Sequence, residues 1–131
     1  MAAKKTSLAN ALLDLVLRNQ AYASQATVYA CLFTANPDAG NPGTEVTGGS
    51  YLRKAVTFAT QAAAGTVSNT AAVTFDTATA LWGTVTGVGL SYTLASGGDD
   101  LLYFGALGTS KVVDVGDQLN FAIGALSVTE S

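Results

Sequence analysis

The chain has 131 residues, of which 49% are hydrophobic and only 11% are charged, and its formal net charge is −3. A chain of this length supports one domain with one hydrophobic core. Its six basic residues are too few to neutralise a run of phosphates, which argues against direct nucleic-acid binding, and the lack of histidine excludes histidine-ligated zinc and Ser-His-Asp hydrolases.

Residues 1–20 are expected to form an N-terminal arm and helix within a single domain that spans residues 1–131. From Ser7 to about Gln20, apolar residues recur at spacings of three and four, and Ser7 can cap the first turn. The stripe consists of Leu8, Leu12, Leu13, Leu15, Val16 and Leu17. Because it leaves no fully polar face, we expect the helix to dock on the domain or on a partner.

Polar residues in the same stretch argue against a targeting or membrane role. Asn10, Asp14 and Arg18 interrupt the apolar run that follows Lys4 and Lys5, whereas a secretory signal has a uniformly apolar core. No other segment approaches the ~20 apolar residues needed to span a bilayer. We therefore expect a protein that folds in a cytoplasm and has no membrane partner.

After Gln20 the pattern changes to alternation, and Thr27–Thr34 predicts a strand. One face would carry Val28, Ala30 and Leu32, and the other Tyr29, Cys31 and Phe33. Because both faces are apolar, we expect this strand to be central and covered. Cys31, the single cysteine, is then a buried free thiol. The following segment, Asn36–Gly49, has two prolines and four glycines and is predicted to be a loop.

Further short strands are predicted along the rest of the chain. They are Arg53–Ala59, Ala72–Phe75, Thr84–Leu94, Leu101–Leu107, Lys111–Val115, Gln118–Ile123 and Leu126–Thr129. Short strands between Gly, Asp and Ser turn signals, with no crossover helix, indicate a mainly β fold. We expect an antiparallel β-sandwich or jelly roll of about eight strands with one short N-terminal helix.

Glycines mark particular connections in this pattern. Ser96–Asp99 is predicted to be a hairpin, and Gly116-Asp117 a tight connection between the strands that contain Val112 and Leu119. Gly87 and Gly89 lie inside an otherwise good strand. They indicate a bulge or the close approach of another part of the chain.

No catalytic, cofactor or metal site is predicted. The carboxylates at strand ends and turns are Asp76, Asp99, Asp100, Asp114 and Asp117, and we interpret them as turn residues rather than as a catalytic pair. A calcium site at Asp99 and Asp100, helped by Asp117, is a weaker alternative. Thr47–Ser50 is read as a turn rather than as a phosphate loop, because no Gly-Lys-Ser/Thr sequence follows.

The aromatic residues are spread along the strands, and their default role is core packing. Trp82 is the one residue considered as either a core anchor or an interface anchor, with the core favoured. The residues that we select as interface candidates are Leu12, Leu13, Leu17, Tyr51 and Trp82.

A series of short segments carries a family resemblance. They are Leu12–Asp14, Val28–Thr34 with Pro37, Thr44–Tyr51 with Arg53 and Ala55–Phe58, Ala72–Phe75, Trp82–Thr86, and Val115–Asp117 with Leu119 and Phe121. Their order and spacing, from about Leu12 to Thr129, resemble small phage virion proteins that are commonly labelled tail-fibre-like. Similar short jelly-roll proteins act as capsid cement or decoration proteins. The resemblance implies a structural protein of the virion without enzymatic activity or catalytic residues.

Two structural roles and one binding role remain open. A receptor-binding fibre usually has a long trimeric shaft, for which 131 residues leave no room. The leading hypothesis is therefore a capsid cement or decoration protein that binds the major capsid protein and copies of itself. The alternatives are a tail-associated component, either tail-fibre-like or in the baseplate, and a module that binds host-surface glycans.

Overall fold

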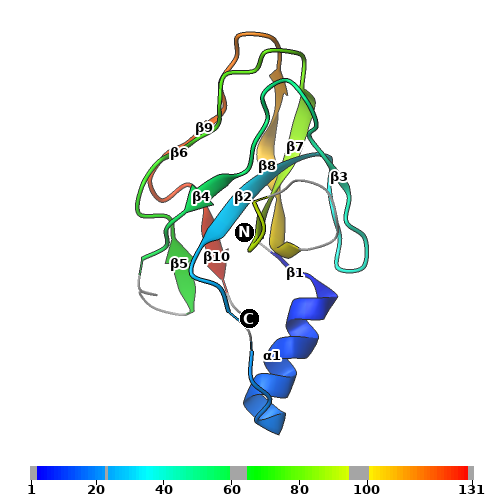
Figure 1. The fold of residues 1–131 in the computed structure, drawn as a ribbon, viewed down its shortest axis with the longest axis vertical. Helices are drawn as coiled ribbons and strands as arrows, with labels where there is room; N and C mark the ends of the chain where they lie inside the picture. The colour runs from blue at the N-terminus through cyan, green and yellow to red at the C-terminus, as the bar shows by residue number, and fades with distance from the viewer. Residues whose placement is uncertain (1–2, 23, 60–64, 95–100, 130–131) are drawn as a thin grey trace.

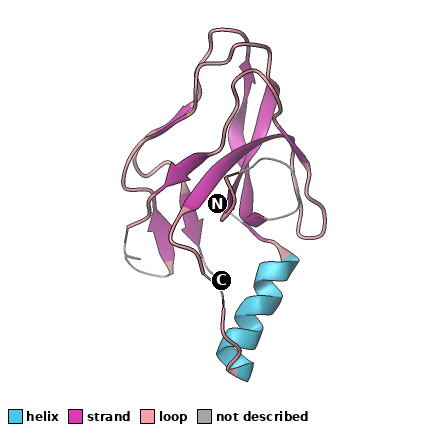
Figure 2. Cartoon of the chain, viewed as in Figure 1, coloured by secondary structure: helices cyan, strands magenta, loops and turns pink. Residues whose placement is uncertain are grey.

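The computed structural model describes residues 3–22, 24–59, 65–94 and 101–129. These residues form one α-helix and ten strands, and every strand pair is antiparallel (Figures 1 and 2). The prediction of a mainly β, antiparallel fold with one short helix near the N-terminus is confirmed.

Six strands form the main sheet, and five of them follow the order β1-β8-β7-β2-β3. The sixth, β4, also pairs with β2. Their bounds are β1 (Ala3–Lys4), β8 (Leu101–Val113), β7 (Gly83–Ser91), β2 (Val28–Ala35), β3 (Thr44–Glu45) and β4 (Lys54–Val56). The two long strands β7 and β8 form the largest part of this sheet. Strand β2 lies beside β7, near the centre of the sheet (Figure 1).

Two small ladders supply the second layer. They are β5 (Thr66–Ser68) with β10 (Ser127–Thr129), and β6 (Val73–Thr74) with β9 (Asn120–Phe121). Val73 and Val128 from these ladders, together with Leu126 just before β10, belong to the same buried cluster as Leu32 and Leu90 of the main sheet. One core therefore lies between the two layers, as in a β-sandwich.

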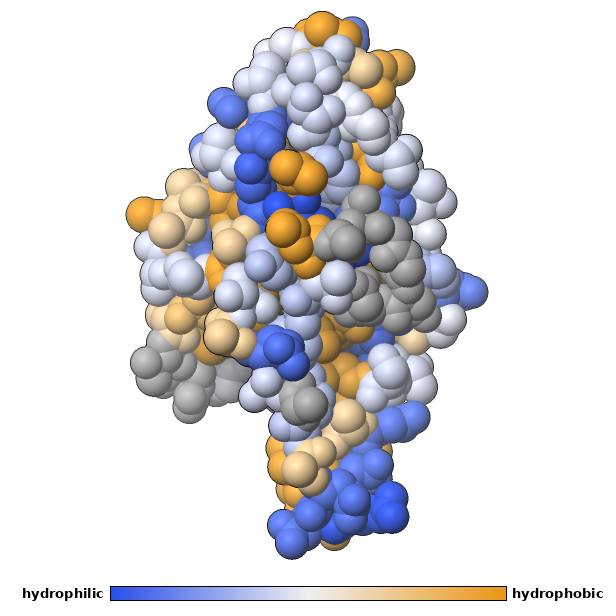
Figure 3. Space-filling view, viewed as in Figure 1, coloured by the Kyte–Doolittle hydropathy of each residue, from blue (hydrophilic) through white to orange (hydrophobic). Residues whose placement is uncertain are grey.

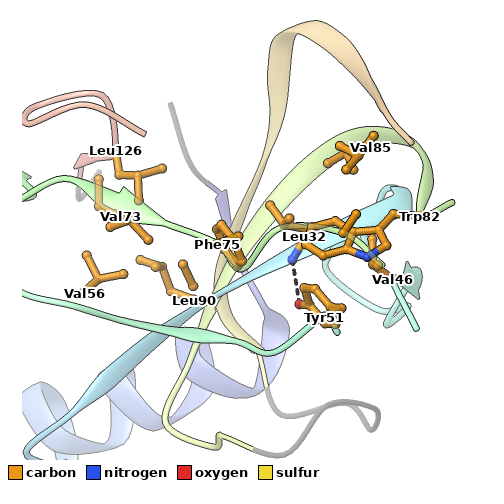
Figure 4. Close-up of a cluster of buried hydrophobic side chains, with 14 residues drawn as sticks. Leu32, Val46, Tyr51, Val56, Val73, Phe75, Trp82, Val85, Leu90 and Leu126 are labelled. Carbon is orange, nitrogen blue, oxygen red and sulfur yellow. Dashed lines mark hydrogen bonds between the residues drawn. The ribbon is translucent and has the colours of Figure 1, made fainter. Parts of the chain in front are cut away.

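Aromatic rings occupy the middle of this core (Figure 4). Tyr51 stacks on Phe75 with ring centroids 6.2 Å apart, and it meets the edge of Trp82 at 5.5 Å. Phe75 in turn contacts Phe121 of β9. Offset and edge-to-face pairs of this kind add to the free energy gained from burying the rings themselves. The preference for Trp82 as a core residue is confirmed, because it is 5% exposed.

Strand β2 has the two covered faces that its sequence predicts. Ala30 and Leu32 face the main core, whereas Cys31 and Phe33 form a second cluster with Leu101 on the opposite face. Cys31 is fully buried and has no disulfide, in agreement with the prediction of a buried free thiol.

Both strand glycines have the close neighbours that were predicted for them. A Cβ at Gly89 would lie 2.8 Å from Leu101 Cδ2, and one at Gly87 would overlap the side chain of Asn36. The β7–β8 register also shifts beside Gly87: Thr86 alone stands opposite Leu107–Ser110. The glycines of β7 therefore mark both close packing and a bulge, whose extra residues lie on the paired strand β8.

Some predicted boundaries are wrong. Leu101–Leu107 and Lys111–Val115 are one strand, β8, because the residues between them stay in the ladder as a bulge instead of turning. Asn36–Gly49 is not entirely loop, since it contains β3. These small deviations depend on pairing with distant strands, and local sequence patterns do not encode such pairing.

Gly116-Asp117 forms a turn, but this turn does not join two paired strands. Gly116 has a φ of +89°, and the amide of Asp117 donates to the carbonyl of Asp114 at 3.0 Å. The strand before the turn pairs β7, whereas β9 after it pairs β6, so the turn carries the chain between the layers. The predicted hairpin at Ser96–Asp99 lies outside the described residues.

A buried polar network fixes β3 against the segment that follows it. The Arg53 guanidinium donates from Nε and Nη2 to the two carboxylate oxygens of Glu45, at 2.8 and 2.7 Å, and from Nη1 to the carbonyl of Thr93. The Tyr51 hydroxyl donates to Glu45 Oε2 at 2.6 Å and accepts the amide of Leu32 (Figure 4). Charge-assisted, bidentate pairs of this kind are the strong class of hydrogen bond.

Candidate functional site

The helix α1 (Thr6–Arg18) is the feature that distinguishes this chain from a plain sandwich, because it projects away from the two layers (Figures 1 and 2). It starts one residue earlier than predicted. Lys5 occupies the N-cap position and no side chain caps the first turn, so the predicted capping role of Ser7 is wrong. The helix ends at Asn19, which has a left-handed φ of 55°.

The first residues of the helix are fixed to the body by Lys5. Its side chain is 2% exposed, and its Nζ donates to the carbonyls of Asp38 and Asn41 at 2.9 and 2.7 Å. The amides of Lys5 and Thr6 donate to Leu102 and Ala39. The start of the helix is therefore held by a buried ammonium group and by strand β8.

The loop that receives Lys5 is itself folded around Asp38. Its carboxylate accepts hydrogen bonds from the side chain of Asn41 and from the backbone amides of Gly40 and Asn41. These bonds favour the ionised form and hold the pKa of Asp38 below its usual value. The loop thus presents two fixed carbonyl groups to the Lys5 ammonium.

Beyond the residues held by Lys5, most apolar side chains of the helix are exposed. Leu8 is its one buried residue, whereas Leu13 is 56% exposed and Leu17 is 75% exposed. Leu15 and Val16 are exposed as well. The prediction that the leucine stripe docks on the domain is therefore wrong for most of its length, and the alternative of docking on a partner remains.

The polar side of the helix is narrow. Arg18 Nη1 lies 2.9 Å from Asp14 Oδ1, one turn away, and this pair is exposed. Figure 3 shows apolar residues along one side of the projecting helix and hydrophilic residues on the other side and at its tip. An exposed pair of this kind contributes little to stability. It does leave the polar strip without net charge.

The five interface candidates separate into two groups. Leu12 is half-buried and Leu13 and Leu17 are exposed, and all three lie on α1. Tyr51 and Trp82 lie in the core of the chain, where Trp82 Nε1 donates to the carbonyl of Gly49 at 2.8 Å. Of these five residues, only the three on the helix offer side-chain surface to a neighbour.

An apolar cavity lies close to the base of the helix. It has a volume of about 450 Å³ and is lined by residues of β2, β5, β7, β8 and β10, among them Val67, Tyr103 and Val128, and by Tyr92, which follows β7. A second, smaller cavity of about 190 Å³ lies between β7 and β8 of the main sheet and residues of β9 and β10 in the second layer. Sequence patterns could not reveal either cavity, because each wall comes from segments far apart in the chain.

The described carboxylates are used structurally. Asp76 pairs with Lys54 at 2.8 Å, and Asp114 and Asp117 accept backbone amides within their own turn, as expected of turn residues. Asp99 and Asp100 lie outside the described residues, as does the calcium site that was considered there. Within the described ranges, no group of three potential metal ligands comes together. In the same ranges, no helix is long and apolar enough to cross a membrane.

Comparison with models of protein families gives a match over nearly the whole chain. Residues 3–129 match the family model described as "Podophage GP4 fiber I protein gp80". No curated protein matches the sequence.

Proposed function

Because the chain belongs to the podophage GP4 fiber I protein gp80 family, whose members are phage virion proteins, we propose that it is a tail-associated, fibre-type structural component. The observation that carries this proposal is the family match, which spans nearly the whole chain. It supports a tail-associated role at least as well as the leading hypothesis of a capsid cement protein. We therefore adopt the tail-associated alternative.

In this role the sandwich is a rigid body and α1 is the element that meets neighbouring chains of the particle. The body is held together by a core that contains an aromatic cluster and by a buried ion pair. The helix leaves that body from a fixed point and exposes apolar side chains such as Leu13 and Leu17. Exposed apolar patches of this kind are typical of protein interaction sites.

The proposed mechanism is mechanical and includes no reaction. Affinity comes from burying leucine and valine side chains of the helix, which contributes about 1.5–3 kcal/mol for each fully buried side chain. No ligand, cofactor or nucleic acid is required for this role. The partners are other virion proteins of the tail region and further copies of this chain.

The proposal is tested by location and copy number on purified particles. Gel densitometry against the major capsid protein measures the number of copies, and labelled antibody fragments locate them by electron microscopy. We expect few copies per particle, with label confined to the tail region. Hundreds of copies spread over the head would contradict the proposal and restore the cement hypothesis.

A further inference from the structure

One surface turn holds the point at which the N-terminal arm changes from strand to helix. Lys5 Nζ donates to the carbonyls of Asp38 and Asn41 at 2.9 and 2.7 Å, and the amide of Thr6 donates to the carbonyl of Ala39 at 3.0 Å. Strand β1 ends directly before Lys5, and α1 begins directly after it. Three backbone carbonyls of a single turn therefore bind the two residues where the helix leaves the sheet.

The far end of the helix receives less support from the body. Leu8, in the first turn, is the one buried residue of α1. In the segment 19–27, which returns to β2, the described residues are exposed except for the half-buried Tyr22. The Tyr22 hydroxyl lies 3.3 Å from that of Tyr92, whereas such bonds are typically about 2.7–2.8 Å long. The direction of α1 is therefore set mainly at its first turn.

The carboxylate of Asp38 shapes the turn that holds the arm, residues 38–41. Its Oδ1 accepts the backbone amides of Gly40 and Asn41 at 2.9 and 2.8 Å, and both of its oxygens accept the side-chain amide of Asn41. The amide of Asp38 donates to the carbonyl of Asn41 at 3.1 Å. Asp and Asn side chains fix turns in this way by bonding to the backbone two residues on. An exposed side chain thus holds the carbonyl groups on which the buried Lys5 depends.

We propose that Asp38 is the positioning residue of α1: its carboxylate keeps the turn folded, and the folded turn fixes the direction in which the helix leaves the body. Without the carboxylate, the three carbonyls no longer face the Lys5 ammonium and the Thr6 amide together. The helix then stays tethered through β1 but varies in direction. The inference rests on the proposed function only for its benefit, since an arm of fixed direction loses less conformational freedom when it binds a partner.

The first test measures the direction of the helix relative to the body. Nitroxide labels are attached at Leu17→Cys, near the end of α1, and at Leu52→Cys on the body, both at exposed positions. The fully buried Cys31 stays unlabelled. Double electron–electron resonance gives the distribution of distances between the labels. We expect one narrow distribution without further change and a clearly broader one when Asp38→Ala is added, with an unchanged β circular dichroism spectrum.

Two matched variants make this test specific. Asp38→Asn keeps a side-chain oxygen for the same backbone amides, so it should restore the narrow distribution. Asp114 accepts the amide of Val115 at 2.7 Å in the turn after β8, at the end of the molecule opposite α1 (Figure 1), so Asp114→Ala should leave the distribution narrow. A narrow distribution in Asp38→Ala, or equal broadening in Asp114→Ala, would overturn the inference. Equal broadening in Asp38→Asn would assign the effect to charge rather than to the turn, and would overturn it as well.

The second test compares hydrogen exchange at two neighbouring amides. The amide of Thr6 is bonded to Ala39 in the turn, whereas that of Lys5 is bonded to Leu102 of β8. In Asp38→Ala we expect the Thr6 amide to exchange about three- to tenfold faster, because bonds to a charged acceptor are lost from the turn, and the Lys5 amide to change less. An unchanged Thr6 amide, or an equal change at both, would contradict a role that acts through the turn.

Particle analysis separates failure of this inference from failure of the proposed function. If α1 stays fixed in Asp38→Ala while the natural chain is found at the tail in few copies, the positioning role is wrong and the fibre role stands. If Asp38→Ala frees α1 but the natural chain coats the head, the positioning role stands and the tail-associated role fails.

Discussion

The indole of Trp82 lies directly against the backbone of Gly49. Its Nε1 donates to the Gly49 carbonyl at 2.8 Å, and a Cβ added at Gly49 would lie 2.7 Å from the same nitrogen. Gly49 also has a φ of +59°, in the region that favours glycine. The turn can therefore approach the aromatic core only because this position has no side chain.

Gly49→Ala should destabilise the protein more than Gly48→Ala. Both positions have positive φ, which costs an L-residue about 1–2 kcal/mol, but a Cβ at Gly48 has no atom within 4 Å. The clash with Trp82 adds about 1–3 kcal/mol at Gly49 alone. Urea unfolding of the two variants measures the difference. Equal losses would mean that the indole moves aside at little cost.

Arg53→Met should destabilise the protein by about 3–5 kcal/mol, because it leaves Glu45 buried without its cation. The neighbouring Lys54→Met is the matched control, since the Lys54 pair with Asp76 is partly exposed and should contribute less than about 1 kcal/mol. Denaturant midpoints compare the two variants. Similar losses for both would show that the buried position of Arg53 confers no special role.

The stability of the protein should fall above about pH 10. Burial, followed by the hydrogen bond to Glu45, raises the pKa of Tyr51 well above its ordinary value of 10.0. Above that value the unfolded chain releases the phenol proton while the folded protein keeps it. The free energy of unfolding then decreases as pH rises, by up to about 1.4 kcal/mol per pH unit.

Urea unfolding between pH 8 and 11 measures this slope, and Tyr51→Phe should reduce it. Tyr22→Phe should also reduce the slope, because burial and its hydrogen bond to Tyr92 raise the pKa of Tyr22 to about 12, so the folded protein keeps this proton as well below pH 11. Identical slopes in the natural chain and in Tyr51→Phe would assign the alkaline transition to other groups.

Leu8→Ala and Leu17→Ala should differ strongly, although both change a leucine of the same helix. Leu8 is 6% exposed, and its truncation should cost about 2–5 kcal/mol, whereas Leu17 is 75% exposed and its truncation should change stability by less than about 0.5 kcal/mol. Thermal unfolding of the isolated protein at low concentration provides the measurement. A large loss at Leu17 would indicate that the helix packs on its own body.

Attachment to particles should resist salt and yield to mild denaturant. The chain has only fifteen charged residues, and the exposed helix face carries leucine and valine. Raising salt from ~0.1 to ~1 M shortens the Debye length from roughly 10 to 3 Å, which weakens ion pairs but not apolar burial. Sedimentation of particles after each treatment gives the retained fraction. Release by salt alone would identify an electrostatic attachment.

Much of the architecture is predictable from local pattern. The alternation in Thr27–Thr34 correctly places β2 at the centre with two covered faces, and the glycines of β7 mark its close contacts. The spacing of three and four correctly places the helix. What local pattern misses depends on distant partners: β1, β3 and β5 have two or three residues each and exist only through pairing.

Only part of the candidate site can be predicted from the sequence. The leucine stripe of α1 is visible in the sequence, but its exposure is not, because the same stripe would suit a docked helix. Lys5 looks like a solvated charge before the helix, and only the folded Asp38 loop shows that it is buried. The roles of Glu45, Tyr51 and Arg53 also depend on contacts across the fold, although their alternate spacing hints that Tyr51 and Arg53 share one face.

The bulge in β8 affects how readily copies of the protein aggregate through an open sheet edge. Among the described residues, the outer edge of β8 meets only the two residues of β1, so most of this edge is open. A long, regular edge with few charges would let strands of other copies add without limit and form amyloid-like aggregates. Leu107–Ser110 interrupt that edge where they stand opposite Thr86, so an added strand would lose its ladder after a few residues. The irregularity thereby favours orderly assembly over polymerisation of the free chain.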